Sequence, residues 1–199
     1  MQVALRIAEA VRAQRRRRGW SLDELAARSG VSRAMISKIE RKASTPTAVL
    51  LARLADALGV SLNALMFDPD TTANHASTTS TVNDQALWRD PASGYTRRMV
   101  SAARGTGDVE IVAIELPAGA RVRFEASASH RIDGRVLLLQ GRLQITLAAE
   151  VLTLEPGDCA RVALHAAHEL HNPGNDDARY LVVTRRLAPL RRVEPSSRS

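Results

Sequence analysis

The sequence predicts two domains: a bundle of five short helices in residues 1–66, followed by an antiparallel β-sandwich or barrel in residues 86–185. Apolar residues recur at helical spacing in the first part, whereas after Trp88 short β-rich runs alternate with turn signals at intervals of about 8–12 residues. Residues 67–85 are mostly small and polar, which predicts a flexible linker. Residues 186–199 are predicted as a basic tail. A chain of 199 residues has room for two small domains.

The first two helices are predicted from an apolar face and from start and stop signals. The first helix ends at Gly19. Ser21 and Glu24 have the spacing of a capping box, in which the hydroxyl accepts from the third amide and the carboxylate accepts from the first. The second helix stops at Gly30. The face of the first helix that we expect to be buried carries Leu5, Ala8 and Val11.

Three more helices follow in the same third of the chain. Ser32 is the expected cap of a helix over residues 33–41. Pro46 is predicted at the first position of a fourth helix, where its missing N–H leaves no hydrogen bond unmade, and this helix ends at Gly59. Ser61 caps a short fifth helix.

Seven short runs in the second part are predicted as strands, and turns such as that at Gly141 separate many of them. The single cysteine, Cys159, excludes an intrachain disulfide framework and a cysteine-based zinc finger. We expect Cys159 to be a small core residue. The predicted strands are residues 95–101, 109–116, 136–140, 142–147, 151–154, 159–164 and 180–184.

Positive charge is concentrated in the first third of the chain. Residues 1–66 carry 12 basic and 5 acidic side chains, whereas residues 67–199 carry 16 of each. A small domain with this excess suits a polyanion, either nucleic acid or an acidic membrane surface. No apolar run approaches the ~20 residues of a membrane span, and the charge near the N-terminus follows the apolar part, which is opposite to a secretory signal. These patterns predict a cytoplasmic protein that does not enter a membrane.

A tight turn at Gly30 joins the second and third predicted helices, so the third should project outward at a steep angle. Arg and Lys side chains donate to guanine O6 and N7, and Ser contacts either base of a pair. The residues expected to hold the two helices together are Ala26, Val31, Ile36 and Ile39. The outer face of the third helix, which suits base reading, carries Ser32, Arg33, Ala34, Ser37 and Lys38.

The stretch GWSLDELAARSGVSRAMISKIERKASTPT, and residues 5–66 as a whole, resemble the phage-repressor-type helix-turn-helix domain of the XRE family. The resemblance implies a five-helix, lambda-repressor-like domain that binds double-stranded DNA through its third helix. It also implies an ion pair between Arg15 and Glu40. The run of four arginines that begins at Arg15 can meet phosphates. The expected DNA-binding residues are Arg16, Arg17, Ser21, Ser32, Arg33, Ala34, Ser37 and Lys38.

The second half resembles a cupin, a jelly-roll β-barrel, in its motifs around Gly119, Gly141 and Gly157 and in the later His168 and Asn172. Metal cupins bind a divalent ion through two His and a Glu of a first motif and a His of a second. The resemblance therefore implies this set of metal ligands. The sequence departs from this set: counted back from Gly141, Ala128 stands at one imidazole position and Gly134 or Arg135 at the carboxylate position. Counted forward from Gly119, the imidazole pair falls instead at Glu125 and Ser127. We therefore expect no metal cofactor. The weak candidates for a divalent metal are His130 and His168.

A barrel mouth without a full metal set still offers a concave site with apolar walls and a few polar groups. The polar groups expected to bind a small-molecule effector are Arg123, His130, Gln140 and His168. The order of a helix-turn-helix followed by a cupin resembles a class of bacterial one-component regulators, in which the cupin senses a small molecule and pairs the subunits.

The leading hypothesis is a sequence-specific, DNA-binding transcription regulator that is not an enzyme. We expect a homodimer, because a dimer reads two half-sites about 34 Å apart. One alternative is a metal-dependent cupin dioxygenase or isomerase that carries a DNA-binding module, which metal analysis with a turnover assay would test. Another is an antitoxin-like regulator whose partner is a second protein, which co-purification of an unrelated chain would support.

Overall fold

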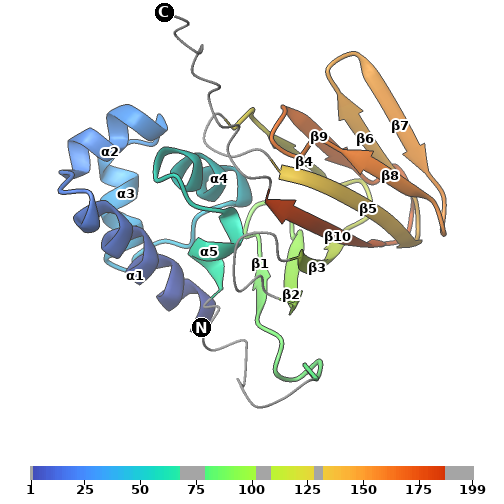
Figure 1. Ribbon diagram of the computed structural model, residues 1–199, viewed down its shortest axis with the longest axis horizontal. Coiled ribbons are helices and arrows are strands. Elements are labelled where there is room, and N and C mark those ends of the chain that lie inside the picture. The colour runs from blue at the N-terminus through green and yellow to red at the C-terminus, as the bar shows by residue number, and fades with distance from the viewer. Residues whose placement is uncertain (1, 68–78, 102–108, 128–131, 187–199) are drawn as a thin grey trace, which may run out of the picture.

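The computed structural model describes residues 2–67, 79–101, 109–127 and 132–186. Within them, five helices form one end of the molecule and ten strands form the other (Figure 1). The helices are α1 (Gln2–Arg17), α2 (Leu22–Ser29), α3 (Arg33–Glu40), α4 (Ala48–Ala57) and α5 (Leu62–Met66). The strands are β1 (Leu87–Arg89), β2 (Thr96–Ser101), β3 (Val109–Leu116), β4 (Arg121–Phe124), β5 (Ile132–Gln140), β6 (Leu143–Leu147), β7 (Glu150–Leu154), β8 (Cys159–Val162), β9 (His168–His171) and β10 (Ala178–Arg186). None of these helices has both the length and the apolar character needed to cross a membrane.

The strands form two antiparallel sheets that share one apolar core. One sheet has the order β1-β2-β3-β10-β5-β8 and the other the order β4-β9-β6-β7. Side chains alternate along each strand, so Val112, Ile114 and Leu116 of β3 are buried, whereas the residues between them are half-buried. Leu143 and Ile145 contribute to the same core from the other sheet. This is the antiparallel cupin sandwich that the sequence predicts.

The helical domain packs against the sandwich, and the two cores are continuous. Leu25, Ile36 and Leu51 are fully buried, from α2, α3 and α4 respectively. The helices α4 and α5 lie next to the strands, whereas α2 and α3 lie on the side away from them (Figure 1). The outer helices are therefore available to a large partner, and the inner ones connect them to the sandwich.

The fourth helix begins two residues later than the sequence predicts. Pro46 is buried but precedes the helix, and Thr47 is the cap, since its hydroxyl accepts a hydrogen bond of 3.3 Å from the Leu50 N–H. The N–H of Ala48 donates to the Asp90 carboxylate at 3.1 Å. A partner 42 positions away in the sequence thus helps to fix where this helix starts.

Two expectations of burial are wrong. Leu5 is 40% exposed, because α1 turns Ile7 and Val11 toward the core and leaves Leu5 on the rim. Cys159 is exposed, because the alternation in β8 points Ala160 and Val162 inward and Cys159 outward.

All seven predicted strands are present, with ends shifted by up to four residues, but β1, β4 and β9 were missed. Each of the three has only three or four residues and a sequence with charged or imidazole side chains, which gives little strand signal. Phe67, assigned to the linker, is buried in the helical core. The linker residues 68–78 and the tail beyond residue 186 lie outside the described residues.

The turn between β5 and β6 is formed at Gly141, as predicted. Its φ is 80°, and a Cβ added there would lie 2.8 Å from the Asp177 carbonyl oxygen. Glycine is required here by conformation and by space.

Candidate functional site

The helices α2 and α3 are fixed at their ends by local hydrogen bonds. The Ser21 hydroxyl accepts from the Glu24 N–H at 3.1 Å, and the Ser21 N–H donates to the Glu24 carboxylate at 2.7 Å, which completes the predicted capping box. The hydrogen bond from the Ser21 N–H lowers the pKa of Glu24. Gly30 has a φ of 65° and ends α2, and the Ser32 hydroxyl caps α3 through the Met35 N–H at 3.3 Å. The turn between the helices is thus defined by its own side chains.

The helix α3 has one buried and one open face. Ile36 and Ile39 have 0% and 1% of their surface exposed and anchor the helix in the core. The opposite face carries the exposed Arg33, Ala34 and Lys38. Ser32 is also exposed and Ser37 is half-buried. The inner and outer residues of α3 lie as predicted, except that Ser37 is half-buried. From α2, Ala26 packs against the core as predicted, and Leu25 is fully buried.

The four consecutive arginines divide into two that are tied to the fold and two that are exposed. Arg15 binds the Glu40 carboxylate through two hydrogen bonds of 2.7 Å, and its side chain is 13% exposed. These bonds raise the pKa of Arg15. Arg18 donates to the Leu58 carbonyl. Arg16 and Arg17 are exposed at the end of α1, where they can reach a polyanion.

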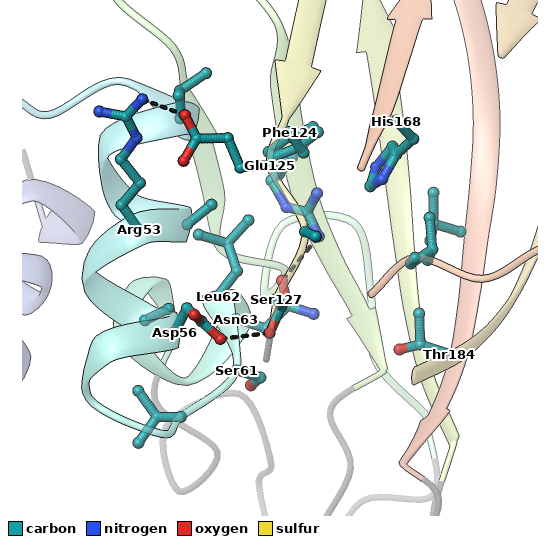
Figure 2. A pocket seen from close by; sticks show the side chains of 18 of the residues that line it. Arg53, Asp56, Ser61, Leu62, Asn63, Phe124, Glu125, Ser127, His168 and Thr184 are labelled. Carbon is teal, nitrogen blue, oxygen red and sulfur yellow. Dashed lines mark hydrogen bonds and ion pairs between the residues drawn. The ribbon is translucent and has the colours of Figure 1, made fainter. Parts of the chain in front are cut away.

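Side chains from α4 bind the mouth of the sandwich directly. Arg53 pairs with Glu125, and Asp56 accepts a hydrogen bond of 2.5 Å from the Ser127 hydroxyl (Figure 2). Both sandwich residues follow β4 directly. The helical domain is therefore held to the edge of the sandwich interior by polar contacts as well as by apolar packing.

A cavity of about 290 Å³ lies between α4 and α5 and the inner face of the sandwich (Figure 2). Its apolar wall includes Phe124, Leu170 and Val182. Arg97 and His168 contribute polar atoms. Because residues of both domains line it, a molecule bound there would contact both at once.

His168 lies in this cavity as a neutral imidazole. Its Nδ1 is 2.8 Å from the Ala166 carbonyl oxygen, which can only accept, so Nδ1 carries the proton and Nε2 is left as an acceptor. The ring stacks on Phe124 with centroids 5.1 Å apart. Burial is the main cause that lowers the pKa of His168, and the charge of Arg97 lowers it further.

Arg97 is a guanidinium buried at the base of the cavity. It is 8% exposed and donates to the Tyr95 hydroxyl at 2.6 Å and to the Asn63 Oδ1 at 3.0 Å. The Asn63 Nδ2 in turn donates to the Glu110 carboxylate at 2.9 Å. One amide from α5 therefore bridges a cation on β2 and an anion on β3.

Of the four predicted effector residues, the structure places His168 in the cavity. Arg123 is exposed on the opposite face of β4 and lines a second recess, because Val122 and Phe124 take the inward positions. Gln140 is exposed at the end of β5. Neither Arg123 nor Gln140 lies in this cavity, so their part in effector binding stays a prediction. His130 lies outside the described residues.

A divalent metal, which the cupin resemblance implies, does not fit the residues around His168. Among the described residues, no three His, Cys, Asp or Glu side chains gather to hold an ion. The Arg97 guanidinium also faces His168 closely enough to lower its pKa, and a cation there would be repelled. Gly134, considered for the carboxylate position, lies against Leu164, which a Cβ would approach to 2.5 Å.

Arg97 and Asn63 were missed by the sequence reading. A signal for Arg97 exists: it shares the period-two face of Tyr95 and Met99, and a charged residue on an apolar face of a strand marks a site. Asn63 offers no such signal, because its partners lie 34 and 47 positions away.

Residues 11–65 match the family described as helix-turn-helix, and residues 136–184 match the family described as cupin domain. The chain is 29% identical over 171 residues to the HTH-type transcriptional regulator SutR of Escherichia coli (strain K12), which covers 83% of this chain and 86% of the relative. The crystal structure of an HTH_3 family transcriptional regulator from Vibrio cholerae has a TM-score of 0.75 at 23% identity and covers 94% of this chain and 98% of that one. The chain thus belongs to the XRE-type helix-turn-helix transcriptional regulators that carry a C-terminal cupin domain.

Proposed function

We propose that this regulator binds operator DNA as a homodimer in the cytoplasm and that a small molecule in the cupin cavity controls the binding. The observation that carries the DNA-binding part is the open face of α3, where Arg33, Ala34 and Lys38 project from a helix anchored by Ile36 and Ile39. Arg16 and Arg17 supply phosphate contacts, and the exposed hydroxyls of Ser21 and Ser32 lie at helix N-termini, which suit phosphate oxygens.

An apolar stripe on the outward face of the larger sheet supports the dimer. Leu181 of β10 pairs with Leu137 of β5 on one side and with Ala113 of β3 on the other. All three point away from the core, and the nearby Leu139 is 52% exposed. Apolar side chains in a contiguous outer row favour contact with a second copy.

The interdomain cavity supports effector binding over catalysis. The charged groups at its rim are already paired, Arg53 with Glu125 and Asp56 with Ser127, and His168 is held by a backbone bond and a ring stack. Side chains fixed in this way around an apolar wall suit ligand recognition.

The test is binding to duplexes that the protein selects from a random pool. If α3 and the exposed arginines contact DNA, affinity should fall about 10³–10⁵-fold between 50 and 200 mM salt for roughly 6–10 phosphate contacts. Replacing both Arg16 and Arg17 with Ala should flatten this dependence for all duplexes. A wild-type affinity that does not change with salt would contradict the proposal.

A further inference from the structure

We propose, building on the effector role above, that the cavity binds a small monocarboxylate, and that its oxygens take the edge of the Arg97 guanidinium now held by Asn63. The argument starts from the state of Arg97. Its Nη1 and Nη2 each have a neutral partner, and its Nε has none among the described residues. No carboxylate in the described part of the chain lies within ion-pair distance of it.

A guanidinium 8% exposed, without a directly bound anion, is an incomplete arrangement. The side of the guanidinium formed by Nε and Nη2 is a fork that matches both oxygens of a carboxylate. Here the single oxygen of Asn63 occupies half of that fork, and the Nε donor is left over. The missing partner is therefore a planar, two-oxygen anion.

A second buried donor near Arg97 also lacks a partner. The Tyr180 hydroxyl has no hydrogen bond among the described residues, and its side chain is 1% exposed. Tyr180 and Arg97 both pair with Ile114 from opposite sides, so they share one row of the sheet. Burial raises the pKa of Tyr180 well above its ordinary value, so its hydroxyl stays a donor. Two unsatisfied donors thus lie on the inner face of the same sheet, of which Arg97 lines the cavity and Tyr180 does not.

The rest of the cavity limits the ligand to one negative charge and a short apolar body. Asp56, Glu110 and Glu125 also line it and would repel a second anionic group. Phe124, Leu170 and Val182 offer apolar contact. A volume of about 290 Å³ is at the small end of ligand sites, which span roughly 300–1,000 Å³.

The position of Asn63 makes the site regulatory. Asn63 belongs to α5 of the DNA-binding domain, whereas Arg97 and Glu110 belong to the cupin. A carboxylate on the Nε and Nη2 fork replaces the Asn63 oxygen and removes one contact that holds α5 to the sandwich. Ligand occupancy and the Asn63 bridge then compete, and DNA that prefers one domain arrangement alters ligand affinity by the same factor.

The first test compares isovalerate with the neutral isovaleramide, which has nearly the same shape. In ¹⁵N-labelled full-length protein, isovalerate should shift the Arg97 Nε–H resonance, assigned by its loss in Arg97→Lys, and isovaleramide should not. Arg97→Gln should weaken isovalerate binding about tenfold, as expected for a charge-assisted hydrogen bond. Arg98→Gln, on the opposite face of the same strand, should change it less than about twofold. Equal binding of acid and amide, or an unmoved Nε–H signal, would overturn the proposal.

The second test uses Asn63→Ala, which frees the fork without removing the cation. Thermal melting first establishes that this variant is folded. Isovalerate should then bind at least as tightly as it binds to the wild type, because the competitor is gone. A loss as large as that of Arg97→Gln would show that Asn63 holds the ligand and would overturn the competition. Salt-dependent DNA binding by a protein that ignores isovalerate would reject the carboxylate site and leave the regulator intact.

Discussion

The carboxylate of Asp90, in the turn after β1, accepts a hydrogen bond of 3.1 Å from the backbone N–H of Ala48, the first residue of α4. Asp90 is 3% exposed, and its second oxygen accepts from the Ala92 N–H at 2.8 Å. A side chain of the cupin domain therefore satisfies one of the unpaired donors at the start of a helix in the DNA-binding domain. The carboxylate also carries the charge that suits a helix N-terminus. A side chain of one domain thus helps to fix the start of a helix in the other.

Asp90→Ala should lower the free energy of unfolding by about 1–3 kcal/mol, because it leaves the buried Ala48 N–H without an acceptor. Asp90→Asn retains one acceptor oxygen and should cost less. Urea unfolding followed by circular dichroism measures both. If the alanine variant were as stable as the wild type, water or another group would have to replace the carboxylate.

The bidentate pair of Arg15 and Glu40 predicts a larger effect. Glu40→Ala strands a guanidinium that is only 13% exposed, which should cost about 3–5 kcal/mol. Asp23→Ala, which removes a 3.2 Å pair between exposed groups, is the matched control and should cost less than about 1 kcal/mol. Because the cores of the two domains are continuous, we expect Glu40→Ala to lower the stability of the whole protein as well as that of the helical domain. Equal melting temperatures of the two variants would contradict this prediction.

Local signals in the sequence were sufficient for the helix-turn-helix. The capping box of Ser21 and Glu24 and the cap at Ser32 involve residues three positions apart, so their geometry follows from a short stretch of chain. The start of α4 was misplaced because its position depends on Asp90, far away in the sequence. Pairing of Arg15 with Glu40 is also long-range, and it was foreseen through the family resemblance alone.

The cupin pocket was predicted less well because a strand was missed. Because β4 is not predicted, the sequence does not show which face of the sheet Arg123 lies on. Neighbouring residues of a strand point to opposite faces, so Phe124 points inward and Arg123 outward. The same alternation within β2 separates the buried Arg97 from Arg98. Strand alternation identifies such residues only after the strand itself is recognised. The contact of Asn63 with Arg97, through which the helical domain closes the cavity, is not predicted by any local sequence signal.

Base reading by α3 predicts a position-specific loss. Arg33→Ala or Lys38→Ala should each cost about 1–3 kcal/mol on the selected operator and relax its preference at one position per half-site. The surface pair of Arg33 with Asp23 leaves Arg33 available, since both side chains are more than half exposed. Arg142→Ala, in an exposed pair on the cupin, is the control and should leave footprints unchanged. Footprints of both α3 variants identical to the wild type would show that another element reads the bases.

The buried imidazole of His168 predicts how stability responds to mild acid. Its pKa in the folded state is lowered from 6.5, mainly by burial, whereas the unfolded chain titrates near 6.5. Below that pH the unfolded chain binds a proton that the folded protein does not, so the stabilisation is fully present above 6.5 and is lost as pH falls toward the folded pKa. One such proton changes the unfolding free energy by at most about 1.4 kcal/mol per pH unit.

His168→Asn keeps an N–H for the Ala166 carbonyl but does not titrate. The stability difference between wild type and His168→Asn, measured by urea unfolding from pH 7.5 to 5.5, should therefore shrink as the pH falls. The half-buried His171, replaced in the same way, should account for a smaller part of the slope. A difference that stays constant over this range would mean that His168 titrates alike in the folded and unfolded chains.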